Sequence, residues 1–129
     1  MVNLSNVLEA VVNTTDIPPY QLMSKSRKKE IAMSRHLFCH MARIYTNCSL
    51  RVIGEFLGSR DYTTVINSIR AAQNMLDTDY EVFVGIVSSC NRYINKEFIE
   101  DLSFTITIPK GVDYTKVKAA LEVFGVSMR

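Results

Sequence analysis

Apolar residues recur at intervals of three and four positions as far as about residue 98, and strict alternation is almost absent from that stretch. Such spacing is that of helices with one buried face. It predicts six helices, around residues 4–12, 20–23, 31–45, 50–57, 61–75 and 82–93. The pattern is therefore typical of a mainly α-helical domain.

Polar residues and a glycine mark where several of these helices begin and end. Ser49 is expected as the N-cap of the helix over residues 50–57, and Gly58, which adopts a left-handed conformation readily, ends that helix. We also expect Asp16 to cap the second helix, ahead of two prolines that a first helical turn tolerates. Residues 77–79, Asp-Thr-Asp, are expected to cap the sixth helix.

The pattern changes after Asp101. Residues 104–108, Phe-Thr-Ile-Thr-Ile, alternate as a half-buried strand does, and a last helix is expected over residues 113–124. We therefore divide the chain into a helical domain, residues 1–98, and a strand-helix tail, residues 99–129. Because a lone strand cannot satisfy its own backbone, the tail either makes a homodimer through residues 103–124 or folds back onto its own domain.

Composition limits the class of protein. The 129 residues, 47% hydrophobic and 22% charged, suit one globular domain with a short appendage. No apolar run approaches the ~20 residues of a membrane span, and no secretory signal begins the chain. Its three cysteines include no Cys-x-x-Cys pair, which favours a reducing compartment. We expect a soluble, cytoplasmic protein with no membrane partner.

The net charge of +2 hides an uneven distribution. Residues 1–72 hold nine basic and five acidic side chains, a net +4, whereas the rest of the chain holds six and eight, a net −2. Five of the basic residues, against Glu30, lie between residues 25 and 35, in a predicted loop that leads into the long helix. The first part of the chain therefore suits a polyanion and the second does not.

Residues 49–70, SLRVIGEFLGSRDYTTVINSIR, show a short helix, a turn and a longer helix, which is the pattern of a helix-turn-helix. In that motif the first residues of the second helix enter the major groove of DNA. An ordinary capped helix start would also be rich in Asp and Thr, so this segment alone leaves both interpretations open. The side chains concerned carry groups that suit base edges and phosphates: Ser59, Arg60, Asp61, Tyr62, Thr63 and Thr64.

Residues 24–76 resemble the C-terminal DNA-binding domain of the bacterial replication initiator DnaA, and the likeness extends over roughly residues 3–95. GSRDYTTV is similar to the family signature G-G-R-D-H-[TS]-T-V, and SLRVIGEFLG and the basic loop also fit. The resemblance implies a helical bundle like domain IV of DnaA, with a Trp-repressor-like helix-turn-helix. It also implies sequence-specific binding to double-stranded DNA, with the basic loop in the minor groove and the recognition helix in the major groove.

The same resemblance implies which residues meet DNA. Arg27 corresponds to the minor-groove arginine, and Lys28 lies beside it in the basic loop. The other expected contacts are Arg35 and His36 in the long helix, Arg43 and Thr46 on the DNA backbone, Leu50 and Arg51 at the start of the supporting helix, and the reading turn of Ser59, Arg60, Asp61, Tyr62, Thr63 and Thr64.

Three departures from the family pattern matter. Tyr62 stands where the family usually has histidine, His36 where it has glutamine, and Ser59 where it has a second glycine. We therefore expect a preferred DNA sequence other than the standard initiator box. Nothing in the chain matches the phosphate-binding loop G-x-x-x-x-G-K-[ST], so we expect no nucleotide partner and no ATPase activity.

Two other kinds of site receive little support. His36, Cys39 and His40 have the helical spacing of metal ligands, but a fourth ligand would have to come from elsewhere, and a half-buried cysteine beside polar histidines accounts for them. No set of nucleophile, base and orienting group is visible, so we expect no enzyme and no cofactor.

The sequence thus predicts a bacterial regulator of transcription or replication that acts by occupying duplex DNA. The alternative is a protein-interaction adaptor that keeps the DnaA-like fold with weak or no DNA binding.

Overall fold

The computed structural model describes residues 2–99 and folds them into six α-helices and a short π-helical segment. In chain order these are α1 (Leu4–Thr15), α2 (Pro19–Leu22), α3 (Lys29–Tyr45), α4 (Leu50–Phe56), α5 (Tyr62–Asp77), α6 (Glu81–Ile94) and η1 (Asn95–Ile99). No strand occurs within residues 2–99, so the expectation of a mainly helical domain is confirmed. The strand and helix expected within the tail, at 103–108 and 113–124, lie outside the described residues.

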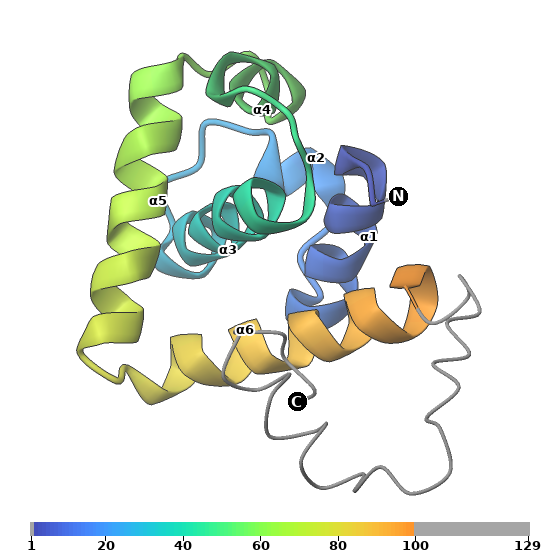
Figure 1. Cartoon of the computed structure of the whole chain (residues 1–129). Coiled ribbons are helices and arrows are strands. Elements are labelled where there is room, and N and C mark those ends of the chain that lie inside the picture. Colours follow the sequence, from blue (N-terminus) through green and yellow to red (C-terminus); the bar gives the residue numbers. More distant parts are fainter. Residues whose placement is uncertain (1, 100–129) are drawn as a thin grey trace, which may run out of the picture.

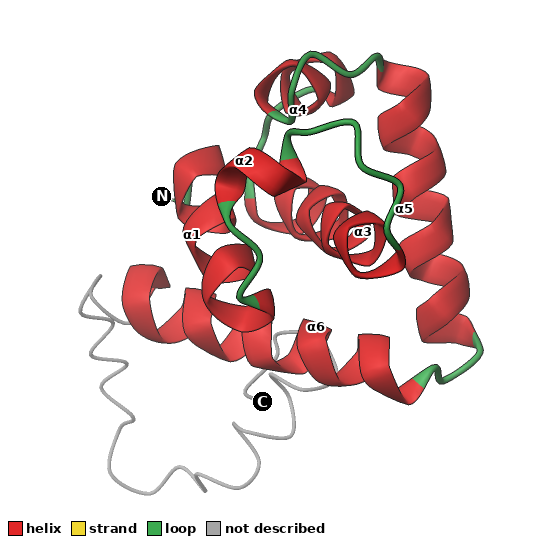
Figure 2. Ribbon diagram, turned by 180° about the vertical axis from the view of Figure 1, so that it is seen from behind, coloured by secondary structure: helices red, strands yellow, loops and turns green. Residues whose placement is uncertain are grey.

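The long helix α3 forms the centre of the bundle. Figure 1 shows it between α5 and α1, with α4 above it and α6 running below it, and Figure 2 shows the same arrangement from behind. Phe38 and Met41 of α3 are fully buried, as are Val7 of α1 and Val65 of α5. Because these side chains belong to one continuous core, the helices that follow α3 are held in fixed positions relative to it.

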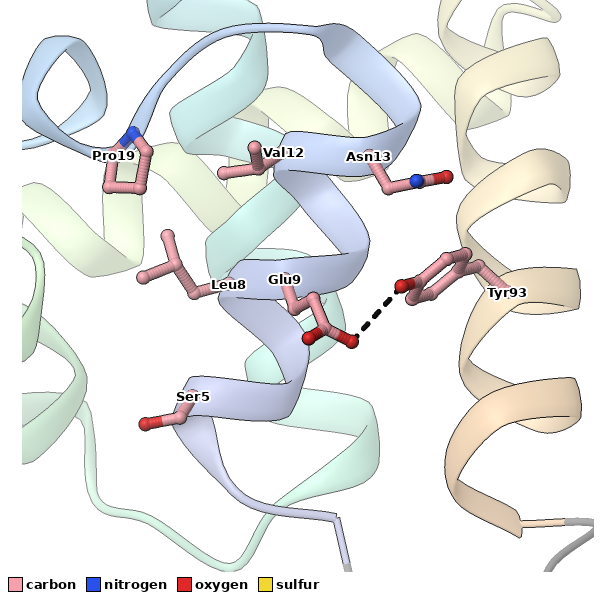
Figure 3. A pocket seen from close by; sticks show the side chains of 7 residues that line it. All are labelled: Ser5, Leu8, Glu9, Val12, Asn13, Pro19 and Tyr93. Carbon is pink, nitrogen blue, oxygen red and sulfur yellow. Dashed lines mark hydrogen bonds between the residues drawn. The ribbon is translucent and has the colours of Figure 1, made fainter.

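The last described helix, α6, closes the bundle by packing against α1. Phe83, Cys90 and Ile94 on its inner face are fully buried. Between the two helices the Tyr93 hydroxyl donates a hydrogen bond to Oε2 of Glu9 at 3.0 Å, beside a shallow hollow (Figure 3). Within residues 2–99 no helix has the length and apolar character needed to cross a membrane.

The helix ends confirm one expected cap and correct two others. Ser49 is the N-cap of α4, and its side chain accepts a hydrogen bond from the Val52 N–H at 3.2 Å. Asp16, in contrast, is the C-cap of α1, with a left-handed φ of 59° and an N–H that donates to the Val12 carbonyl. Pro18 occupies the N-cap position of α2 instead.

The segment expected to cap α6 belongs to the end of α5. Asp77 is the last residue of α5, Thr78 is its C-cap, and Asp79 has a left-handed φ of 52°. Tyr80 occupies the N-cap of α6 and makes no side-chain capping bond. Aspartate is favoured at N-caps and also tolerated in the left-handed region, since its short side chain bonds locally, so residue type could not separate the two positions.

Candidate nucleic-acid interface

A short turn joins α4 to α5 at an angle, as the sequence pattern predicts for residues 49–70. Gly58 and Ser59 are both left-handed, with φ of 83° and 58°. The Ser59 N–H donates to the Glu55 carbonyl at 3.1 Å, and the Arg60 N–H donates to the Gly54 carbonyl at 2.8 Å. The end of α4 is therefore tied to the first residues ahead of α5 by the backbone itself.

Gly54 allows α4 to lie close to this turn. A Cβ added at Gly54 would come within 2.1 Å of the Arg60 carbonyl oxygen and 3.3 Å of a Val65 methyl group. No side chain larger than hydrogen fits there without a backbone shift. The resulting packing sets the direction in which α5 leaves the turn.

The first residues of α5 present polar groups to solvent. Asp61 is the N-cap, and its Oδ1 accepts hydrogen bonds from the Thr64 N–H at 2.8 Å and the Thr64 hydroxyl at 2.9 Å. These bonds from Thr64 hold the pKa of the Asp61 carboxyl below its usual range. Tyr62 is 53% exposed, and Thr63 is exposed as well. We call this surface, residues 61–64, the reading head.

Beside the reading head runs the basic loop, residues 23–28, which connects α2 to α3. In both overall views it passes alongside α5 (Figures 1 and 2). Two hydroxyls shape it, since the Ser26 N–H donates to Oγ of Ser24 at 3.2 Å and the Lys28 N–H donates to Oγ of Ser26 at 3.3 Å. Arg27 and Lys28 are exposed. Neither serine was predicted to shape the loop, although the alternation of serines and cations in Ser-Lys-Ser-Arg is a signal for such turns.

Arg35 is placed differently from the DNA contact expected of it. It is 9% exposed and lies beneath the basic loop. Burial, followed by the charge of Arg60, lowers the pKa of its guanidinium. The guanidinium donates to four backbone carbonyls of the preceding segment: Leu22 from Nε at 2.7 Å, Ser26 from Nη1 at 2.5 Å, and Gln21 at 3.3 Å and Ser24 from Nη2.

Arg60 also has partners within the chain. It is half-buried, and its Nη2 donates to the Ser24 carbonyl at 2.5 Å while its Nη1 donates to the Leu57 carbonyl. Both terminal nitrogens of this predicted DNA contact are therefore bonded to the backbone. No signal in the sequence distinguishes an arginine of this kind from one that faces a phosphate.

The remaining predicted contacts lie around the same helices. Arg43 and Arg51 are exposed, and Leu50 is half-buried at the start of α4. Thr46 is the C-cap of α3, and its hydroxyl donates to the Ala42 carbonyl at 2.6 Å. His36 is half-buried, and within residues 2–99 its Nδ1 is enclosed without a hydrogen-bond partner.

Among residues 2–99, the histidines and Cys39 of α3 are not grouped as metal ligands. Cys39 is fully buried, and burial raises the pKa of its thiol to about 12. Burial also lowers the pKa values of His36 and His40, and the neighbouring charges of Arg35 and Arg43, respectively, lower them further. In the part of the chain that the structure describes, no group of three or more His, Cys, Asp or Glu side chains could hold a metal ion.

Comparison with known proteins agrees with this geometry. The exposed reading head, the turn beneath it and the basic loop define a helix-turn-helix protein of the DNA-binding class. Residues 4–71 match the family model described as the bacterial DnaA protein helix-turn-helix, so the chain belongs to that family.

Three relatives, each named chromosomal replication initiator protein DnaA, indicate how much of such a protein the chain covers. The one from Bacteroides thetaiotaomicron is 30% identical over 78 residues, which are 60% of this chain and 17% of that protein. The one from Thermus thermophilus is 34% identical over 76 residues, 59% of this chain and 17% of that protein. The one from Aliarcobacter butzleri is 28% identical over 94 residues, which are 73% of this chain and 22% of that protein. The chain thus spans less than a quarter of the length of these relatives.

Proposed function

We propose that the chain binds particular sequences in duplex DNA and regulates replication or transcription by occupying them. The observation that supports this most directly is the joint placement of the exposed reading head and the exposed cations of the basic loop. The Arg60–Ser24 hydrogen bond of 2.5 Å fixes the two beside each other. A reading head in the major groove would leave the loop at the adjacent minor groove and its phosphates. The relatives are named chromosomal replication initiator proteins, which favours a role in replication.

Binding is proposed to need no nucleotide and no cofactor. The 129-residue sequence contains no match to the phosphate-binding loop G-x-x-x-x-G-K-[ST]. Reading by hydroxyl, phenol and carboxylate groups requires only contact with base edges and phosphates.

Tyr62 is proposed to give this chain a base preference of its own. It is the first residue of α5 and is 53% exposed, so the phenol projects from the reading head. A phenol is longer than the imidazole usual at this position, and its hydroxyl both donates and accepts hydrogen bonds. The preferred sequence should therefore differ from the standard initiator box at the base that this side chain meets.

Selection from a randomised duplex library tests the proposal, followed by titration of the enriched duplex over a range of salt concentrations. Arg27→Ala should weaken binding to all duplexes and reduce the slope of log K against log salt by about 1.

Thr63→Ala should cost about 1–3 kcal/mol of discrimination between bases while leaving nonspecific binding nearly unchanged.

Arg92→Ala is the matched control, because Arg92 is exposed on α6 and its loss changes net charge equally. It should leave both the affinity and the salt slope close to those of the unaltered chain. If no motif is enriched and no duplex binds at low salt, the proposal is overturned and the adaptor function is favoured.

A homodimer through residues 103–124 would add to this function. One small module reaches few phosphates, and two copies joined together would hold two half-sites at once. Sedimentation equilibrium of the whole chain measures this directly. A dimer mass at micromolar concentration would support the proposal, and a monomer mass would count against it.

A further inference from the structure

The turn between α4 and α5 touches the basic loop at two points. A Cβ added at Gly58 would come within 2.5 Å of the Met23 carbonyl oxygen, so the two backbones are in close contact there. Two residues later, Arg60 donates to the Ser24 carbonyl, which is 36 positions earlier in the chain. The loop and the turn are therefore joined by both packing and a hydrogen bond.

One carbonyl group is shared by two arginines. Ser24 accepts hydrogen bonds from Arg60 and from Arg35, which reach it from α5's turn and from α3. A carbonyl oxygen has two lone pairs and can accept both. Placing two guanidinium groups near one another is electrostatically unfavourable, and the ring of carbonyls around them offsets that repulsion. The basic loop is thus held at the same atom by α3 and by the turn that precedes α5.

The bonding of Arg60 is unlike that of an arginine held ready for a phosphate. A guanidinium that grips a phosphate or a guanine presents its paired nitrogens outward as a fork. In Arg60 both terminal nitrogens already donate to the chain, to Leu57 and to Ser24. The side chain is half-buried, in contrast to the exposed side chains of Arg27 and Lys28.

We propose that Arg60 is a positioning residue that fixes the basic loop to the reading head, so that the two meet DNA as one rigid unit. The contribution of Arg27 to binding then depends on Arg60, although Arg60 itself is bonded to the chain and is not a DNA contact. This inference rests on the proposed DNA binding. It also makes a statement about the chain without DNA, which can be tested separately.

Arg60→Lys separates positioning from charge. Lysine keeps the positive charge, but its single nitrogen cannot span the Leu57 and Ser24 carbonyls in the fork geometry of arginine. In the chain without DNA, hydrogen exchange of the loop amides, Ser26 and Lys28, should become roughly tenfold faster. The matched control is Arg92→Lys on α6, which should leave exchange in the loop unchanged.

A double-mutant cycle of Arg60→Lys and Arg27→Ala tests the inference on DNA binding. The affinity of each variant is measured for the duplex that the unaltered chain enriches from the library. Arg60→Lys should weaken binding by roughly tenfold despite its unchanged charge. Adding Arg27→Ala to it should then weaken binding by much less than Arg27→Ala does alone, because a displaced loop no longer delivers Arg27. Thermal melting of each variant checks that the helical bundle remains folded.

The outcomes separate the inference from the proposed function. Unchanged loop exchange in Arg60→Lys overturns the inference whether or not DNA binds. The inference is also overturned if Arg60→Lys and Arg27→Ala weaken DNA binding independently, so that the double variant shows the product of the two single fold-losses. That result would identify Arg60 as a separate DNA contact. If the unaltered chain binds no duplex, the proposed function fails together with this extension of it, even if the loop exchange changes as expected.

Discussion

Ser59 shows how a single residue carries the strain of the turn. A left-handed conformation costs roughly 1–2 kcal/mol for a residue with a Cβ and almost nothing for glycine. The turn needs two such residues in succession, and only the first of them, Gly58, is a glycine. The φ of 58° at Ser59 is held in place by the bonds on either side of it, from Ser59 to Glu55 and from Arg60 to Gly54.

Ser59→Gly should therefore raise the free energy of unfolding. The relief of strain exceeds the added backbone entropy of glycine in the unfolded chain, for a net gain of about 0.5–1 kcal/mol. Ser88→Gly is the control, since Ser88 lies within α6 and the same change there should cost about 0.5–1 kcal/mol. Urea denaturation with an unchanged slope measures both. Equal destabilisation by the two variants would show that Ser59 is unstrained.

The roles of arginines could not be deduced from residue type. Arg27, Arg35 and Arg60 all lie in segments that resemble the family's DNA-contacting ones, and the sequence places all three at DNA. The structure leaves Arg27 exposed but surrounds Arg35 with backbone carbonyls and occupies both terminal nitrogens of Arg60. Those carbonyls belong to residues distant in sequence, so only the tertiary fold reveals them.

The helices themselves were predictable from the sequence, and several of their ends were not. Apolar periodicity located all six α-helices of residues 2–99, because each buries one face on the common core. Ser49 was correctly expected at an N-cap, whereas Asp16 and Asp79 adopt left-handed conformations after helices. The short side chain of aspartate forms local hydrogen bonds both at an N-cap and in a left-handed residue after a helix. The packing of the neighbouring helices decides which of the two positions it occupies.

The packing of α4 on the turn predicts opposite effects for two glycine substitutions. Gly54→Ala places a methyl group against the Arg60 carbonyl and should lower the free energy of unfolding by about 1–3 kcal/mol. Gly85→Ala on α6 adds a methyl group with nothing within 4 Å and should raise it by about 0.5–1 kcal/mol. Chemical denaturation compares the two. A Gly54→Ala chain as stable as the Gly85→Ala chain would contradict the close approach of α4.

Helix α3 links the core of the domain to the candidate DNA interface. Its inner face carries Phe38 and Met41 into the core, while Arg35 on the same helix supports the basic loop. His36 and His40 are half-buried along it. Protonation of these imidazoles therefore bears on the stability of the domain as well as on its charge.

Stability should decrease as the pH falls below about 6.5, the ordinary pKa of histidine. Burial lowers the pKa values of His36 and His40 in the folded chain, so the unfolded chain takes up protons first. The stabilisation is complete above pH 6.5 and is lost as the pH falls through the folded-state pKa values. Asp61 affects stability in a separate, more acidic pH range. Because its pKa is lowered in the folded chain, its ionised carboxyl stabilises the fold above pH 3.8, and this stabilisation is lost as the pH falls further.

Urea denaturation at a series of pH values measures this dependence. His40→Gln should flatten part of the decrease below pH 6.5, and the double variant with His36→Gln should flatten it further. A double variant with the pH dependence of the unaltered chain would show that other groups are responsible.

The carbonyl groups that surround Arg35 also set the smallest piece of this chain that can work alone. A fragment beginning at Lys29 would contain α3, α4 and α5, and with them the whole helix-turn-helix. It would lack residues 21–26, and the guanidinium of Arg35 would lose all its backbone acceptors. Grafting α4 and α5 alone onto another scaffold would therefore transfer the helix-turn-helix sequence without the basic loop and its support. A functional graft must begin upstream of Gln21.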